Sequence, residues 1–185
     1  MKKKQYGYSP NDCSVGDLDG VRPAAVMCRG YYARTTLVSY QVQDKKLIQN
    51  WIYDSALSTG ISAAGQGNHN LSVADVDRDG KDEIIYGSCA FDDDGTLLYS
   101  TGLGHGDAMH VSDLDPDRPG LEVWQVHEES ASFSKGYEMH DAATGEIIWS
   151  GAVTTDNGRG MATEPQHYFR QVVFLPATAL KRRPV

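Results

Sequence analysis

Short runs that alternate apolar and polar residues recur along the chain, and clusters of glycine, aspartate and asparagine separate them. A period of two, in runs rich in β-branched and aromatic residues, is typical of half-buried strands. No stretch of useful length has the helical period of about 3.6 residues. The pattern predicts an all-β protein with a strand ending near Val15, followed by strands over residues 24–30, 36–40, 47–52, 70–74, 83–87, 96–99, 109–112, 121–126, 136–140 and 146–149.

One acidic loop between two of these expected strands has the spacing of a calcium site. Residues 75–83 read DVDRDGKDE, with carboxylates at loop positions 1, 3, 5 and 9 and a glycine at position 6. The loop is not an EF-hand, because that motif needs a later glutamate where this chain has Tyr86. A solvated acidic turn without metal is the alternative. We expect Ca²⁺ to bind through Asp75, Asp77, Asp79, the Lys81 carbonyl and Glu83.

Two further loops repeat this pattern with changes. The later one has its carboxylates at Asp113, Asp115, Asp117 and Glu122. We expect it to bind Ca²⁺ more loosely, because Pro119 is inserted and moves the last carboxylate one place further along. The earlier one has Asp17 and Asp19 but lacks the third and ninth carboxylates, so its turn is expected to survive without metal. Since the three loops begin 58 and then 38 residues apart, the chain contains three imperfect copies of one unit.

The repeated unit favours a β-propeller over a β-sandwich. Copies of this length, with about four strands each, are typical of propeller blades, and a sandwich does not explain the repeated acidic loop. Propellers generally have about 4–8 blades. We therefore expect residues 1–163 to form about three blades of an incomplete propeller, with 164–185 as a divergent C-terminal tail and the missing blades as possible partners.

Charge and composition exclude several classes of function. Hydrophobic residues make up 40% of the chain, which is enough for a core, and the net charge of −8 argues against nucleic acid as a partner. No window is apolar enough for a transmembrane helix, and the polar segment after the first lysines does not resemble a signal peptide. As it stands, the chain is expected to remain in the cytoplasm. We expect no disulfide among Cys13, Cys28 and Cys89.

Glycine-rich segments before the expected inner strands carry the residues best suited to chemistry. His69 precedes Asp75 by 6 residues, His105 precedes Asp113 by 8, and Arg159 precedes Glu164 by 5. In a propeller these places face one mouth of the central channel, opposite the acidic loops. Two imidazoles and a guanidinium beside Asp107 suit an anionic ligand. Alternatively, the histidines are ordinary hydrogen-bonded strand residues.

Several longer strings are more specific than any of these spacings. They read GQGNHNLSVAD at 65–75, GLGHGDAMH at 102–110 and LEVWQVHE at 121–128, with DGVRP at 19–23 and RGYYART at 29–35. These strings closely resemble the family 11 rhamnogalacturonan lyases, and the resemblance covers roughly residues 15–163. It implies a calcium-rich propeller of eight blades, of which this chain holds about three.

The resemblance also implies an activity. Members of the family cut the rhamnogalacturonan I backbone of pectin, an acidic plant polysaccharide, by β-elimination outside the cell or in the periplasm. The chain would be a fragment of such an endolyase, with Ca²⁺ as cofactor. In that reaction Arg159 is expected to pair with the uronate carboxylate or to assist proton transfer. The resemblance further implies that His69, His105 and Asp107 hold a calcium-centred or sugar-binding arrangement.

The sequence also allows two other functional interpretations. One is a calcium-binding adhesion or carbohydrate-binding propeller without catalysis, since acidic loops of this kind also occur in such modules. The other is an inactive truncated product. The histidines and Arg159 favour the lyase, because an adhesion repeat has no reason to place them at one mouth.

Overall fold

The computed structural model describes residues 11–128, 134–162 and 175–176 and is built from antiparallel sheets, so the predicted all-β class is confirmed. The first sheet contains β1 (Asn11–Gly16), β2 (Ala24–Arg29), β3 (Thr36–Gln43) and β4 (Lys46–Asp54). The second contains β5 (Ser72–Ala74), β6 (Glu83–Ile85), β7 (Cys89–Phe91) and β8 (Leu97–Ser100). The third contains β9 (Ala108–Ser112), β10 (Glu122–Val126), β11 (Tyr137–Asp141) and β12 (Ile147–Gly151).

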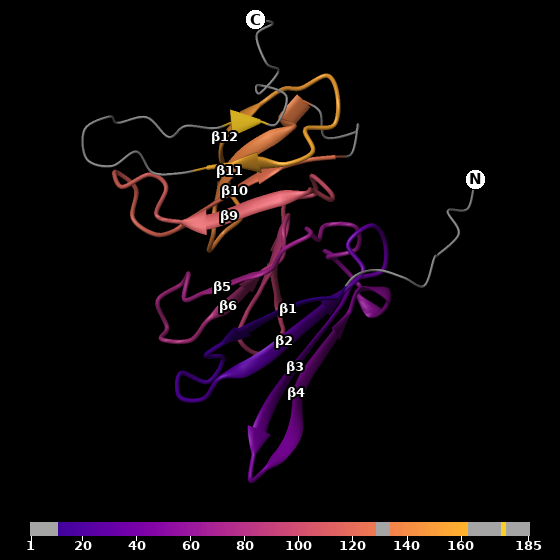
Figure 1. Ribbon diagram of the computed structural model, residues 1–185, viewed down its shortest axis with the longest axis vertical. Helices are drawn as coiled ribbons and strands as arrows, with labels where there is room; N and C mark the ends of the chain where they lie inside the picture. The colour runs from indigo at the N-terminus through magenta and orange to yellow at the C-terminus, as the bar shows by residue number, and fades with distance from the viewer. Residues whose placement is uncertain (1–10, 129–133, 163–174, 177–185) are drawn as a thin grey trace, which may run out of the picture.

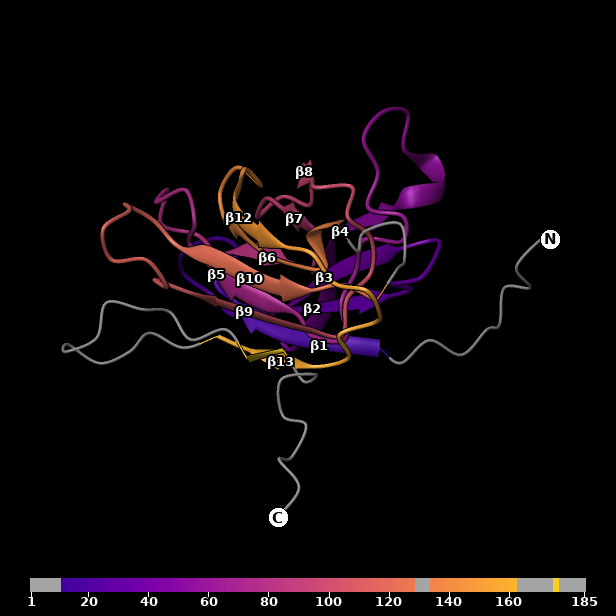
Figure 2. The same ribbon diagram turned by 90° about the horizontal axis from the view of Figure 1, so that it is seen from above.

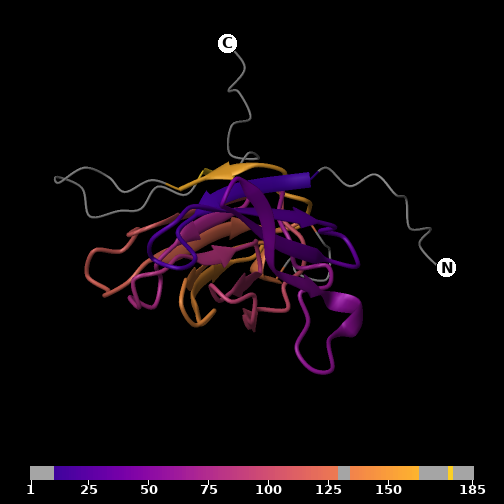
Figure 3. The same ribbon diagram turned by 90° about the horizontal axis from the view of Figure 1, so that it is seen from below.

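The three sheets are stacked face to face in chain order (Figure 1). Within each sheet, consecutive strands are neighbours. The first strands β1, β9 and β13 (Gly160–Met161) lie toward one side of the stack, and β4, β8 and β12 lie toward the other (Figure 2). The β4–β5 connection, which carries the short helix η1 (Ser55–Leu57), projects away from the sheets (Figure 3).

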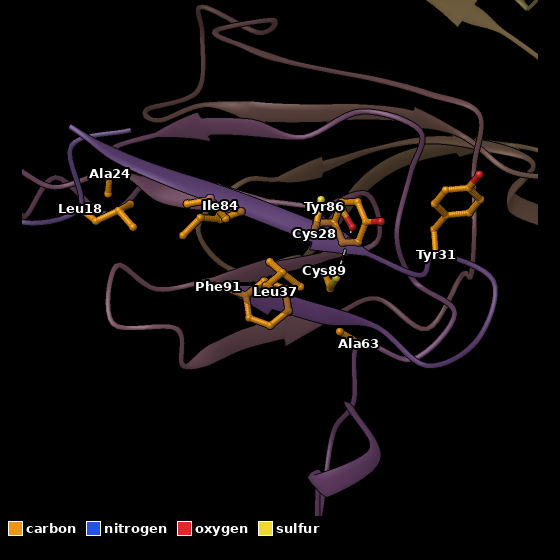
Figure 4. Packing of buried hydrophobic residues seen from close by; sticks show 11 residues of the cluster. Leu18, Ala24, Cys28, Tyr31, Leu37, Ala63, Ile84, Tyr86, Cys89 and Phe91 are labelled. Atoms are coloured by element: carbon orange, nitrogen blue, oxygen red, sulfur yellow. Dashed lines mark hydrogen bonds between the residues drawn. The ribbon is translucent and has the colours of Figure 1, made fainter. Parts of the chain in front are cut away.

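Apolar side chains fill the spaces between the sheets. Leu37, Ile84 and Phe91 are fully buried between the first and second sheets, in a cluster that runs from Leu18 to Tyr31 (Figure 4). A second cluster joins the second sheet to the third, and a third cluster covers the far face of the third sheet around Trp124. The alternation predicted from the sequence thus buries a different face of each strand against each neighbouring sheet.

The three sheets are copies of one unit at the level of backbone register. The residue just before each acidic loop pairs with the first residue of the next strand, as Gly16 with Ala24, Ala74 with Glu83 and Ser112 with Glu122. The pairing between the third and fourth strands shifts at the same place in every sheet, after Ser39, Ala90 and Met139. Ala24 therefore stands where the other two sheets have a buried glutamate, which explains why the first loop is a degraded copy.

An aromatic side chain on the fourth strand of a sheet covers a glycine turn of the next sheet. A methyl group on Gly95 would lie 2.6 Å from the Trp51 ring, and one on Gly145 would lie 2.4 Å from the Tyr99 ring. The Trp51 indole also donates a hydrogen bond to the Asp93 carbonyl (2.7 Å). By register Trp149 is the third member of this series, and it is 40% exposed. We call these the aromatic–glycine contacts.

A buried polar network lies at the junction of the second and third sheets. The carboxylate of Glu138 is within 3.0 Å of His140 Nδ1 and 3.5 Å of His127 Nε2. The hydroxyl of Tyr99, from the second sheet, lies 3.2 Å from His140 Nε2. Glu138, His127 and His140 have no more than 1% exposed surface. Burial opposes ionisation, but the two histidines outweigh it and lower the pKa of Glu138.

The predicted eight-bladed ring is not formed by this chain alone, because the described sheets do not close. β13 lies beside β9 and pairs with β14 (Leu175–Pro176), which begins a further sheet. Apart from these two residues, the predicted tail, including Glu164, falls outside the described residues. All three cysteines are free thiols, Cys28 and Cys89 in the core and Cys13 at the surface. Among the described residues, no helix has the length and apolar character needed to cross a membrane.

Candidate functional site

The segments that lead into β5 and β9 run side by side and bring three predicted residues together. A parallel bridge joins Asn68 to Gly106. His69 Nε2 lies 3.1 Å from Asp107 Oδ1, and His105 Nε2 lies 3.6 Å from the same oxygen. The two imidazole rings are 4.8 Å apart. The structure therefore brings His69, His105 and Asp107 together where the chain enters two adjacent inner strands.

The contacts of His105 show that this cluster needs a positive charge near the Nε2 atom of that residue. Its Nδ1 lies 2.7 Å from the Gly67 carbonyl, which can only accept, so Nδ1 carries a proton. Its Nε2 then faces Asp107 and also the Glu128 carboxylate at 3.3 Å. An unprotonated Nε2 would point its lone pair at two carboxylates. The arrangement is satisfied by a proton on Nε2 or by a cation held among these groups.

Three residues at this site were missed by the sequence reasoning. Glu128 follows β10, and Tyr31 and Tyr32 lie in the connection between β2 and β3. Tyr31 stacks on His105 at 4.7 Å, and the Tyr32 ring centre is 4.3 Å from that of His105. Burial, and then the charge of Glu128, raise the pKa of Tyr32 to about 12. Both tyrosines belong to the string RGYYART at 29–35, whose resemblance to the lyase family could have marked them as site residues.

Backbone contacts fix the loops that carry these side chains. The Thr35 hydroxyl donates to the Gly30 carbonyl (2.6 Å) and contacts the Ala63 carbonyl (3.0 Å). Gly30 has φ +84, and a Cβ there would lie 2.0 Å from the Arg34 carbonyl oxygen, so this turn requires glycine. On the other side of the site the Ser88 hydroxyl donates to the Gly104 carbonyl (2.8 Å). These contacts fix the positions of the loops that carry the cluster.

Arg159, the predicted catalytic residue, comes just before β13. Its side chain is exposed, and within the described part of the chain it has no hydrogen bond or ion pair. β13 lies beside β9, whose lead-in segment carries His105 and Asp107. The structure therefore places Arg159 directly before the strand that lies beside β9, with its side chain exposed among the described residues.

The loop after β5 lies at the other end of the strand and is shaped for a cation. Asp75, Asp77 and Glu83 each offer an oxygen, and these oxygens lie within 4.8 Å of one another. Two buried oxygens in the loop, Asp75 Oδ1 and Glu83 Oε1, have no hydrogen-bond partner among the described residues. Burial raises the pKa of Glu83 to about 7. Two unpartnered buried oxygens are costly unless a cation or proton satisfies them, so the residues fit Ca²⁺.

The remaining predicted ligands of this loop are held by local bonds. Asp77 Oδ1 accepts from the Asp79 N–H (3.0 Å), and Asp79 Oδ1 accepts from the Lys81 N–H (2.9 Å). The Lys81 ammonium lies 3.0 Å from Asp93 and 3.4 Å from Asp79. These turns fold the loop and leave one carboxylate oxygen of Asp75 and one of Glu83 for a ligand.

The loop after β9 is held by the same glutamate–backbone hydrogen bonds, but its carboxylates lie further apart. Glu122 is buried and accepts from the N–H groups of Leu114 (2.9 Å) and Asp115 (3.0 Å), as Glu83 accepts from Val76 (2.8 Å) and Asp77 (3.4 Å). Within the described residues, the carboxylates of Asp113, Asp115, Asp117 and Glu122 do not approach one another as closely as those of the Asp75 loop. Burial raises the pKa of Glu122. In the first sheet Asp19 pairs with Arg22 instead (2.8 Å).

Comparison with known proteins identifies the family. The model of rhamnogalacturonan lyase family 11, C-terminal domain, matches residues 12–172, so the chain belongs to this family. It is 62% identical over 145 residues to the rhamnogalacturonan exolyase YesX of Bacillus subtilis (strain 168), covering 78% of this chain and 24% of that protein. It is 59% identical over 150 residues to the rhamnogalacturonan endolyase YesW of the same organism, covering 81% of this chain and 24% of that protein.

A solved structure agrees with this assignment. The crystal structure of the exotype lyase YesX superposes with a TM-score of 0.83 at 55% identity, covering 89% of this chain and 27% of that chain. The chain thus spans about a quarter of the length of the curated relatives it matches.

Proposed function

We propose that this chain is part of a calcium-dependent rhamnogalacturonan endolyase that cleaves the rhamnogalacturonan I backbone by β-elimination. The observation that carries the proposal is the meeting of His69, His105, Asp107 and Glu128 at one end of adjacent inner strands, in a chain of the lyase family. Relatives named as exolyase and endolyase support backbone cleavage itself.

The residues match what β-elimination at a uronic acid requires. The sugar carboxylate must be neutralised, the C5 proton removed and the C4 oxygen helped to leave. Arg159, exposed and unpaired within the described residues, is suited to hold the carboxylate. His69 is half-buried and oriented by Asp107, so it binds and orients a hydroxyl or carboxylate of the sugar.

Calcium has two proposed places in this function. In the acidic loops, Asp75, Asp77, Asp79, the Lys81 carbonyl and Glu83 would hold one ion, with Asp113, Asp115, Asp117 and Glu122 holding another less tightly. Near the sugar site, His69, His105 and Asp107 offer atoms within 4.8 Å of one another. A cation there would supply positive charge beside the uronate carboxylate.

We also propose that the three sheets are propeller blades and that the missing blades complete the site. Sheets repeated in register and stacked face to face support this arrangement. A large acidic polysaccharide does not cross membranes, so the proposed place of action is outside the cell or in the periplasm.

The test is a chimera in which residues 12–162 replace the corresponding quarter of the endolyase YesW. Incubation with rhamnogalacturonan I and calcium is expected to release unsaturated products, followed by ultraviolet absorbance, with long fragments early in the reaction. The His105→Ala chimera should lose this activity. A folded chimera that binds the polysaccharide without forming unsaturated product would support the carbohydrate-binding alternative.

A further inference from the structure

Tyr32 is an exposed aromatic ring beside the His69–His105–Asp107 cluster. It is 48% exposed, whereas its neighbour Tyr31 is 3% exposed and belongs to the core. Burial of Tyr31 supplies the packing in this loop, so core stability does not require a second aromatic residue at position 32. The exposed part of the ring therefore forms an apolar surface beside a cluster of polar groups, a combination that ligand-binding sites use.

The ring is held in place although it is exposed. It meets Tyr31 edge-on at 4.7 Å and lies 4.3 Å from the His105 ring centre. Its hydroxyl is hydrogen-bonded to Glu128. The backbone of this loop is fixed by a bond from the Gly65 N–H to the Ala33 carbonyl (2.8 Å). A ligand therefore meets a surface that loses little conformational entropy on binding.

The surroundings of Tyr32 define the chemistry of that ligand. The histidines, Asp107 and Glu128 bind polar or charged groups, whereas the exposed part of the Tyr32 ring offers an apolar surface. A ligand that uses both must present hydroxyl or carboxylate groups beside a C–H surface, as sugars do. Of the two alternating sugars of the proposed substrate, rhamnose is the more apolar, because a methyl group replaces its C6 hydroxymethyl.

We propose that Tyr32 is a stacking platform for a 6-deoxyhexose, the rhamnose unit next to the galacturonate held by the histidine and carboxylate cluster. This inference rests on the proposed function for the choice of sugar. The phenol stays neutral over the working pH range, since its pKa is about 12, so it does not repel the acidic polymer. Its hydroxyl is used by Glu128, which leaves the ring itself for the sugar.

The test measures binding of two simple glycosides to the purified chain in calcium by saturation-transfer NMR titration. Methyl α-L-rhamnopyranoside is expected to receive saturation at its C6 methyl. Tyr32→Ala should weaken its binding about tenfold, the size of one aromatic contact. Tyr32→Phe should stay within about twofold, because it keeps the ring. Trp149→Ala, which removes an aromatic group 40% exposed on β12, is the matched control and should leave binding unchanged.

Methyl α-D-galactopyranosiduronate separates this inference from the proposed function. Binding of the galacturonide that persists in Tyr32→Ala while rhamnoside binding falls supports the platform. If the wild-type chain does not bind the rhamnoside, or binds it equally well with alanine at position 32, the platform is refuted, and retained galacturonide binding then leaves the lyase proposal standing. If the wild-type chain binds the rhamnoside but not the galacturonide, the result counts against the lyase proposal and not against the platform. Tyr32→Leu keeps the bulk without the ring and replaces the alanine variant if that variant does not fold.

Discussion

His105 Nδ1 lies 2.7 Å from the carbonyl oxygen of Gly67, a contact that joins the segments leading into two neighbouring sheets. His105→Ala removes the donor and leaves this buried carbonyl without it. We expect a loss of about 1–3 kcal/mol in the free energy of unfolding, measured by urea denaturation. His105→Asn, whose amide can donate at a similar position, should recover part of this loss. Equal losses in both variants would contradict the role of the hydrogen bond.

Calcium should stabilise the chain through the Asp75 loop first. At a hundredfold excess over its Kd, a single site adds about 2.7 kcal/mol to the free energy of unfolding. Asp75→Ala should abolish most of the calcium-dependent rise in melting temperature, and Asp113→Ala should have a smaller effect. Calorimetry with calcium and with a chelator measures both. If neither variant changes calcium binding or melting temperature, the loops are ordinary acidic turns.

The buried network around Glu138 should make the free energy of unfolding depend on pH in the acidic range. Burial works against the charged form, but His140 and His127 prevail and hold the pKa of Glu138 below its usual value of 4.5. A lowered folded pKa means that this stabilisation is complete above about pH 4.5 and is lost as the pH falls through the folded value.

Glu138→Gln isolates this contribution. It should lower the free energy of unfolding by about 3 kcal/mol at pH 7, the cost of breaking a buried pair. The gap between variant and wild type should narrow as the pH falls below about 4.5 and close once the pH has passed the lower folded pKa of Glu138. Urea melts at a series of pH values with a chelator present test this, and a gap independent of pH would be the contrary result.

In the YesW chimera, substitution of Arg159 should affect activity, whereas substitution of Asp75 should affect stability first. Arg159→Ala should abolish turnover with little change in melting temperature, because its side chain is exposed and makes no described ion pair. Asp75→Ala should lower the melting temperature first and activity as a consequence. An Arg159→Ala chimera with near-normal kcat would remove Arg159 from the mechanism.

Trp51 and Trp149 occupy equivalent positions but should differ in their energetic importance. Trp51→Ala should cost about 3–5 kcal/mol, as for a packed aromatic residue, because the Trp51 ring covers Gly95 and its indole bonds to Asp93. Trp149→Ala should cost clearly less, since its ring is 40% exposed. Chemical denaturation of both variants provides the comparison, and equal costs would show that the contact with Gly95 is not what stabilises Trp51.

The sequence predicted the elements of the fold well, because their signals are local. Alternation and turn residues located nearly every strand, and the acidic spacing located the loops that join them. The meeting of His69 with His105 was also predictable, because both precede equivalent strands of a repeat.

Glu128 and Tyr32 were not predictable in the same way. Glu128 follows a strand of the third sheet and Tyr32 sits in a loop of the first, and their closeness depends on how the sheets stack. The β3–β4 hairpin was longer than predicted, with β3 ending at Gln43 and β4 beginning at Lys46. Asp44 and Lys45 form its turn at positive φ without the glycine that marks the other turns.

The aromatic–glycine contacts give the stack a direction. The second unit carries both the ring for the unit after it, Tyr99, and the glycine for the unit before it, Gly95, so a duplicated copy of that unit would satisfy both neighbours without further change. Gene duplication can therefore lengthen such a protein one repeat at a time. The first sheet is the exception, because Asp44 and Lys45 form its β3–β4 turn, which has no glycine for a ring to cover.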